Sequence, residues 1–92
     1  MENKTITKRE ILDKVVDLFV QQLGLNDDSV PTDVNFYQEY AMDSLDCIGV
    51  LMEIESEYHI SIPDDKAKEV CTLDQIVDLV AETLEGSGCK VA

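Results

Sequence analysis

Ser44 lies in the part of the sequence that is richest in chemical signals, the run Asp43-Ser44-Leu45-Asp46. Asp43 or Ser44 can cap a helix, because an apolar stripe with helical spacing follows from Cys47. The free backbone N–H groups and the positive dipole end of such a helix favour a phosphate bonded to the Ser44 oxygen. The simpler alternative is a serine that only caps the helix, and the residues alone favour it.

No other side chains form a pattern typical of an active site or a metal site. His59 is the only histidine, and nothing marks a third triad member or a glycine-rich phosphate loop. Cys47, Cys71 and Cys89 are widely spaced and contain no CxxC pair. The acidic segment 27–33 lacks the glycine and the terminal glutamate of an EF-hand loop. We therefore predict a protein that is not an enzyme and has no metal site.

The first element that must position this serine is a helix near the N-terminus. Thr7 and Glu10 form a capping box, and apolar residues then recur every three or four positions. This pattern predicts a helix over residues 8–23, with Gly24 just beyond its end. Residues 25–43 mix turn residues with isolated apolar ones, so we expect a long ordered loop.

The helix that begins at residue 43 or 44 has two apolar faces. One face carries a core stripe made of Cys47, Val50, Leu51, Ile54 and Tyr58. The other face carries what we call the apolar strip, Leu45, Ile48 and Met52. The carboxylates between and beside the two faces are those of Asp46, Glu53, Glu55 and Glu57. An apolar strip flanked by carboxylates suits docking against a basic-rimmed groove of a partner. The alternative is that a small bundle buries both faces.

Two further helices complete the expected fold. Pro63 predicts a short helix, and the capping box of Thr72 and Gln75 predicts a long last helix that ends at Gly86. No strand-like alternation is present, so we predict an all-α bundle of three longer helices plus one short helix. Residues 1–85 would form the domain, and residues 86–92 lack periodicity and are expected to be a flexible tail.

Composition limits the choice of partners. The 92 residues fit one domain, and 20 acidic residues against seven basic ones give a formal charge of −13. Nucleic-acid backbones and anionic membranes would be repelled, whereas basic protein surfaces would be attracted. The odd, unpaired cysteines suit a reducing cytoplasm. The sequence has no apolar run long enough to insert into a membrane, and a monomer is expected.

Several segments together resemble the acyl carrier protein family of the bacterial type II kind. Asp43-Ser44-Leu45-Asp46 resembles the family's Asp-Ser-Leu prosthetic-group site, and residues 36–42 resemble its Phe-x-x-Asp/Glu-Leu-Gly segment. The family's Met-x-Leu-Glu-x-Glu-Phe and Ile-Pro-Asp segments correspond to Met52, Ile54, Glu55, Glu57, Tyr58, Ile62, Pro63 and Asp64. The resemblance covers roughly residues 6 to 85.

The resemblance implies a carrier whose Ser44, beside Asp43, bears a covalently attached 4'-phosphopantetheine. A phosphopantetheinyl transferase would attach this arm from coenzyme A, and its thiol would carry acyl intermediates as thioesters in fatty-acid or polyketide-type synthesis. The partner surface would consist of Leu45, Asp46, Ile48, Met52, Glu55 and Glu57, facing acyl-processing enzymes with basic docking surfaces.

The sequence departs from the family pattern near the site. Ala41 replaces the usual glycine before the site, and Gly49 stands where a glutamate is usual. These differences leave open which synthesis system the carrier serves. A carrier for aminoacyl or alanyl groups is one alternative. An unmodified acidic adaptor that binds a basic groove through the helix after Ser44 is another.

Overall fold

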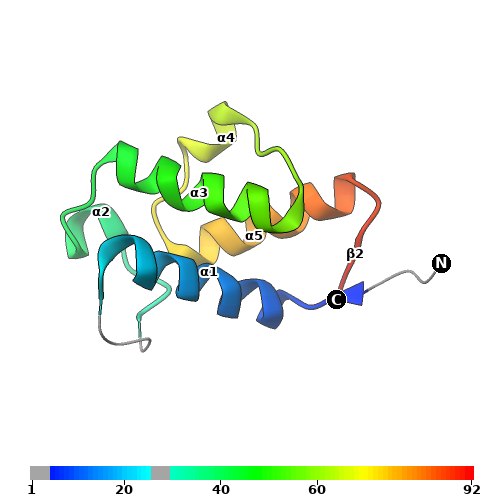
Figure 1. Cartoon of the computed structure of the whole chain (residues 1–92), viewed down its shortest axis with the longest axis horizontal. Helices are drawn as coiled ribbons and strands as arrows, with labels where there is room; N and C mark the ends of the chain where they lie inside the picture. Colours follow the sequence, from blue (N-terminus) through cyan, green and yellow to red (C-terminus); the bar gives the residue numbers. More distant parts are fainter. Residues whose placement is uncertain (1–4, 26–29) are drawn as a thin grey trace.

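The computed structural model describes residues 5–25 and 30–92. Its three longer helices are α1 (Lys8–Leu23), α3 (Ser44–Tyr58) and α5 (Leu73–Gly86), and two short helices are α2 (Phe36–Glu39) and α4 (Asp64–Ala67). Figure 1 shows α1, α3 and α5 packed along one another, with α2 at one end and α4 beside α3 and α5. The expected helical bundle is therefore confirmed, although one additional short helix, α2, interrupts the long loop.

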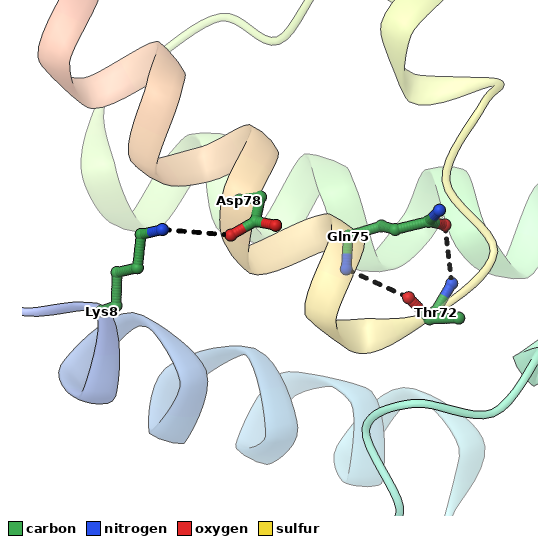
Figure 2. Close-up of polar contacts among 4 residues, drawn as sticks. All are labelled: Lys8, Thr72, Gln75 and Asp78. Atoms are coloured by element: carbon green, nitrogen blue, oxygen red, sulfur yellow. Dashed lines mark hydrogen bonds and ion pairs between the residues drawn. The ribbon is translucent and has the colours of Figure 1, made fainter.

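The start signals in the sequence form the predicted hydrogen bonds. Thr7 caps α1 through a capping box with Glu10, and Gly24 ends α1 in the left-handed conformation. Thr72 caps α5 through a box with Gln75, which Figure 2 shows as two hydrogen bonds. These local contacts explain why α1 and α5 have the bounds that the sequence predicts.

The core lies between the three longer helices. Each helix contributes side chains at the spacing of three and four that the sequence shows, and α2 adds one aromatic ring. The fully buried large side chains are Ile11, Val15, Phe19, Phe36, Val50, Ile54, Leu73, Ile76, Val80 and Leu84. Because these positions fill the space between the helices, α3 has its core stripe fixed inward, and its opposite side faces outward.

The two ends of the described chain meet in a small parallel strand pair. Strand β1 (Thr5–Ile6) pairs with β2 (Lys90–Val91), and the Ala92 N–H donates to the Ile6 carbonyl at 2.9 Å. The Lys8 ammonium also lies 3.2 Å from a carboxylate oxygen of Asp78 on α5 (Figure 2). The expectations of no strand and of a tail without regular structure from residue 86 onward are therefore corrected. Periodicity cannot reveal strands of two residues, because tertiary pairing forms them.

Candidate functional site

Ser44 is the first residue of α3, and Asp43, not Ser44, caps the helix. The Asp43 carboxylate accepts a hydrogen bond from the Asp46 N–H at 3.0 Å, and Asp46 accepts one from the Asp43 N–H at 3.2 Å. The interpretation of Ser44 as a plain N-cap is therefore wrong. Its side chain is exposed, and its hydroxyl makes no hydrogen bond to the residues that the structure describes.

The backbone around Ser44 suits a phosphate on its oxygen. Within residues 5–25 and 30–92, no acceptor pairs with the N–H groups of Ser44 and Leu45, which lie in the first turn of α3. These donors and the helix dipole attract an anion, whereas the carboxylates of Asp43 and Asp46 repel one. A phosphodiester carries a single negative charge, and an exposed position keeps the carboxylates screened. The site therefore fits a group attached through phosphate.

The segment immediately before Ser44 is fixed by a buried side chain and contains a residue in the left-handed conformation. Met42 is buried, which anchors the chain immediately before the helix. Ala41 has a φ of 54°, in the left-handed region where a side chain is strained. The sequence departure at this position therefore has a structural consequence, since the usual glycine adopts this conformation without strain.

The apolar strip is exposed on the surface of α3. Leu45, Ile48 and Met52 are 73%, 48% and 61% exposed, and they are the exposed large hydrophobic residues among those described. The alternative in which the bundle buries both faces of α3 is therefore wrong. Side chains of this size leave an outward apolar surface immediately after Ser44.

The carboxylates predicted to flank the strip have contacts inside the protein. Glu55 is half-buried, and its carboxylate accepts a hydrogen bond from the Ile62 N–H at 2.7 Å. Glu57 lies 3.5 Å from the Lys14 ammonium on α1. Glu53 is exposed and makes no hydrogen bond or ion pair with another described residue. The helical pattern places Glu53 among the carboxylates beside the apolar strip, but the expected partner surface did not include it.

A cleft opens directly beside Ser44. Its volume is about 410 Å³, and its lining residues come from α2, α3, α4 and the position just after α4: Tyr37, Ser44, Cys47, Ile48, Leu51, Asp64, Ala67 and Lys68. A larger hollow of about 680 Å³ along α1 contains none of the predicted site residues. Sequence reasoning missed Tyr37 and Lys68, because periodicity cannot place two short helices against a third.

The inner wall of the cleft holds two titratable groups. Burial and a hydrogen bond with Cys47 raise the pKa of Tyr37 from 10.0 to about 12. Burial also raises the pKa of the Cys47 thiol, although the hydrogen bond from Tyr37 acts in the opposite direction. Cys47 therefore remains a protonated packing residue, as its place on the core stripe predicts.

Comparison with known proteins shows which family the chain belongs to. The sequence family described as "Phosphopantetheine attachment site" matches residues 13–80, a range that contains Ser44 and the whole cleft. The chain belongs to the acyl carrier protein family. An acyl carrier protein of Chlorobium phaeovibrioides is 35% identical over 77 residues, which are 84% of this chain and 99% of the relative. One from Picosynechococcus is 39% identical over 74 residues, 80% of this chain and 91% of the relative.

A solved structure of a carrier protein supports the same assignment. The solution structure of the acetyl actinorhodin acyl carrier protein from Streptomyces coelicolor matches with a TM-score of 0.67 and 28% identity. The match covers 83% of this chain and 92% of the other. The predicted fold and family are thus confirmed.

Family membership defines the general activity. An acyl carrier protein carries acyl intermediates on phosphopantetheine and is not itself a catalyst. Its role as a carrier implies that it interacts with acyl-processing enzymes. Among the described residues, no helix is both long and apolar enough to cross a membrane. The described residues also contain no cluster of three or more potential metal ligands.

Proposed function

We propose that Ser44 is the residue of this acyl carrier protein that bears the 4'-phosphopantetheine arm. The observation that carries the proposal is the free, exposed hydroxyl at the first position of α3, since Asp43 performs the capping. The unpaired N–H groups beside it favour a phosphate, and the adjacent cleft can receive a group at the end of the arm. The Asp-Ser-Leu segment and the family match support the same residue.

Attachment requires a partner enzyme, and the carrier role needs no internal base. The Ser44 oxygen attacks the phosphorus of coenzyme A that bears the pantetheine, and a new P–O bond forms while adenosine 3',5'-bisphosphate leaves. A phosphopantetheinyl transferase supplies the metal ion and accepts the hydroxyl proton. His59, the only histidine in the chain, ends α3 and therefore lies at the opposite end of that helix from Ser44.

The partner surface is the apolar strip together with the carboxylates near it. Leu45, Ile48 and Met52 supply exposed apolar area, and Glu53 supplies a carboxylate that pairs with none of the other described residues. Asp46, Glu55 and Glu57 add negative potential while they hold the structure of α3 and its neighbours. Basic surfaces of the transferase and of acyl-processing enzymes complement this face, and the cytoplasm is the proposed setting.

Intact mass measurement tests the attachment residue. Incubation with coenzyme A, Mg²⁺ and a broad-specificity transferase should add one phosphopantetheine to the wild-type protein and none to Ser44→Ala. Ser56→Ala, which removes an exposed serine from the same helix, is the matched control and should still be modified. Failure of the wild-type protein with several competent transferases would favour an unmodified adaptor. Modification of Ser44→Ala would place the arm elsewhere.

A further inference from the structure

A single positively charged residue lines the cleft beside Ser44. Lys68 comes directly after α4, and it is the one cation among the described residues that line this cleft. Its side chain is exposed and forms no ion pair with another described residue. The lysine therefore keeps its positive charge available to an anionic group at the cleft.

Neighbouring cations are occupied elsewhere. No Lys or Arg lies between Lys14 and Lys66, so α3 contains none. The three cations of α1 form ion pairs with carboxylates. Lys66 lies 2.6 Å from a carboxylate oxygen of Glu82 on α5 and lines a different hollow. An anion attached at Ser44 therefore meets Lys68 and not one of these paired cations.

The backbone of Lys68 is fixed, whereas its side chain is free to move. The Lys68 N–H donates to the Asp64 carbonyl at 3.1 Å and so extends the hydrogen bonding of α4. Ile62 and Val70, on either side of α4, are buried and anchor the segment to the bundle. A lysine carries its ammonium group on a flexible four-carbon stem. Because Lys68 and Ser44 line one cleft, the ammonium group can approach the Ser44 oxygen without movement of the backbone.

A phosphodiester on Ser44 would be attracted and repelled at once. The N–H groups in the first turn of α3 attract it, whereas the carboxylates of Asp43 and Asp46 repel it. Each of these carboxylates accepts a backbone hydrogen bond in the capping box, so neither is free to turn away. An ammonium group binds phosphate as a point charge, and Lys68 can therefore offset this repulsion.

Resting on the proposed attachment at Ser44, we propose that Lys68 binds the phosphodiester of the arm and holds the first part of the arm beside α4. The contact forms after the transfer reaction, so Lys68 is a binding residue and not a catalytic one. It adds a tie between α3 and α4 that the apo form lacks. The Asp64 carboxylate, which lines the same cleft, competes for the ammonium group in both forms.

Phosphorus NMR of the holo-protein tests the contact at the phosphate itself. The arm is attached enzymatically from coenzyme A, and intact mass verifies the loading of each variant. At about 50 mM salt, Lys68→Met should shift the phosphodiester signal, whereas Lys68→Arg should keep it near the wild-type position because the charge is retained. At about 500 mM salt, the wild-type signal should move toward that of Lys68→Met, since salt screens an exposed pair. The signal of Lys68→Met should respond much less to salt.

A stability measurement gives the strength of the contact. Urea denaturation of the apo and holo forms provides folding equilibrium constants for the wild-type protein and for Lys68→Met. The substitution should lower the constant of the holo form roughly 1.5- to 5-fold more than that of the apo form, which is the effect of one exposed ion pair. Circular dichroism verifies that each variant is folded.

Lys66→Met is the matched control, because it removes the same charge two residues earlier in the chain. It should leave the phosphodiester signal and the difference between apo and holo stability unchanged. The inference is overturned if Lys68→Met leaves the signal in place, if Lys66→Met shifts it equally, or if both forms respond equally to Lys68→Met. A wild-type protein that gains no mass from coenzyme A would instead refute the attachment at Ser44, and this inference would fall with it.

Discussion

Ala41 adopts a backbone conformation that costs energy for any residue with a side chain. Its φ of 54° lies in the left-handed region, which costs about 1–2 kcal/mol for an L-residue. Glycine removes that strain but also gains freedom in the unfolded chain, a cost of about 0.4–1 kcal/mol. We therefore expect Ala41→Gly to raise the free energy of unfolding by about 0.5–1 kcal/mol in urea denaturation.

The reciprocal substitution at Gly24 is the control for this prediction. Gly24 has a φ of 69°, and a Cβ atom there would meet nothing within 4 Å, so only the backbone responds. Gly24→Ala should lower the free energy of unfolding by about 1 kcal/mol. If Ala41→Gly instead destabilised the protein, the turn before Ser44 would have a different backbone from the one described.

Tyr37 gives a prediction about pH. Its pKa in the folded protein is about 12, above the ordinary 10.0, so the folded state binds its proton more tightly than the unfolded state does. The resulting stabilisation is complete below pH 10 and is lost as the pH rises toward 12. Titration by tyrosinate absorbance should show one tyrosine with a pKa near 12 that disappears in Tyr37→Phe. If the component that disappears in Tyr37→Phe instead titrates with an ordinary pKa, the half-buried placement of Tyr37 would be contradicted.

The site residues divide into those that the sequence can identify and those that it cannot. The helical wheel places Leu45, Ile48 and Met52 on a different side of α3 from the core stripe, but only the structure decides that this side is exposed. The division of roles between Asp43 and Ser44 does not follow, since both residue types are good caps. The contact of Glu55 with the Ile62 N–H depends on how the following loop folds back, which no local pattern encodes.

At the scale of elements, the helices with complete local signals are the ones that the sequence predicts. Thr7 and Thr72 start α1 and α5 at the expected residues, because a capping box is formed within four consecutive residues. Helix α2 and the pair of β1 and β2 depend on distant partners. The Phe36 N–H donates a hydrogen bond to the Cys71 carbonyl, and the Ala92 N–H donates one to the Ile6 carbonyl. Such contacts join residues that are far apart in the sequence, so periodicity does not report them.

Gly49 supplies a prediction about α3. A glycine within a helix costs about 1 kcal/mol relative to alanine, so Gly49→Ala should stabilise α3. A Cβ atom there would lie 2.7 Å from the Gln22 side-chain nitrogen, and this exposed, flexible side chain must move. We therefore expect a small rise in the thermal midpoint for Gly49→Ala or Gly49→Glu. The glutamate would also restore the carboxylate that is usual in the family at this position.

The Gln22 contact can be separated from helix propensity by a second variant. In a Gln22→Ala background the obstruction is absent, so Gly49→Ala should stabilise by the full amount of about 1 kcal/mol. A loss of stability in both backgrounds would show that Gly49 allows a close approach of α1 and α3. The placement of the apolar strip on the outward side of α3 would then need revision.

At the scale of the whole molecule, the charge balance directs the protein toward cationic partners. The formal charge is −13, and among the residues that the structure describes, four basic ones lie in ion pairs at the surface: Lys8, Arg9, Lys14 and Lys66. Such pairs contribute little to stability, because water screens them and ordering the side chains costs entropy. Because these pairs neutralise basic side chains, the charges that remain unpaired on the surface are mostly carboxylates, and a partner encounters a negative potential.

The last prediction follows from this field and concerns binding of the transferase. Raising the salt concentration from about 50 mM to about 500 mM shortens the Debye length severalfold, so the affinity should fall. Glu53→Lys changes an exposed carboxylate beside the apolar strip that forms no hydrogen bond or ion pair within residues 5–25 and 30–92. This variant should weaken binding roughly three- to tenfold at low salt and much less at high salt. Glu85→Lys makes the same change of net charge on α5 and is the matched control. Calorimetry measures both variants. Equal losses in the two would mean that the partner responds to total charge, and the docking face on α3 would be refuted, whereas a loss confined to Glu53→Lys assigns recognition to the helix that begins with Ser44.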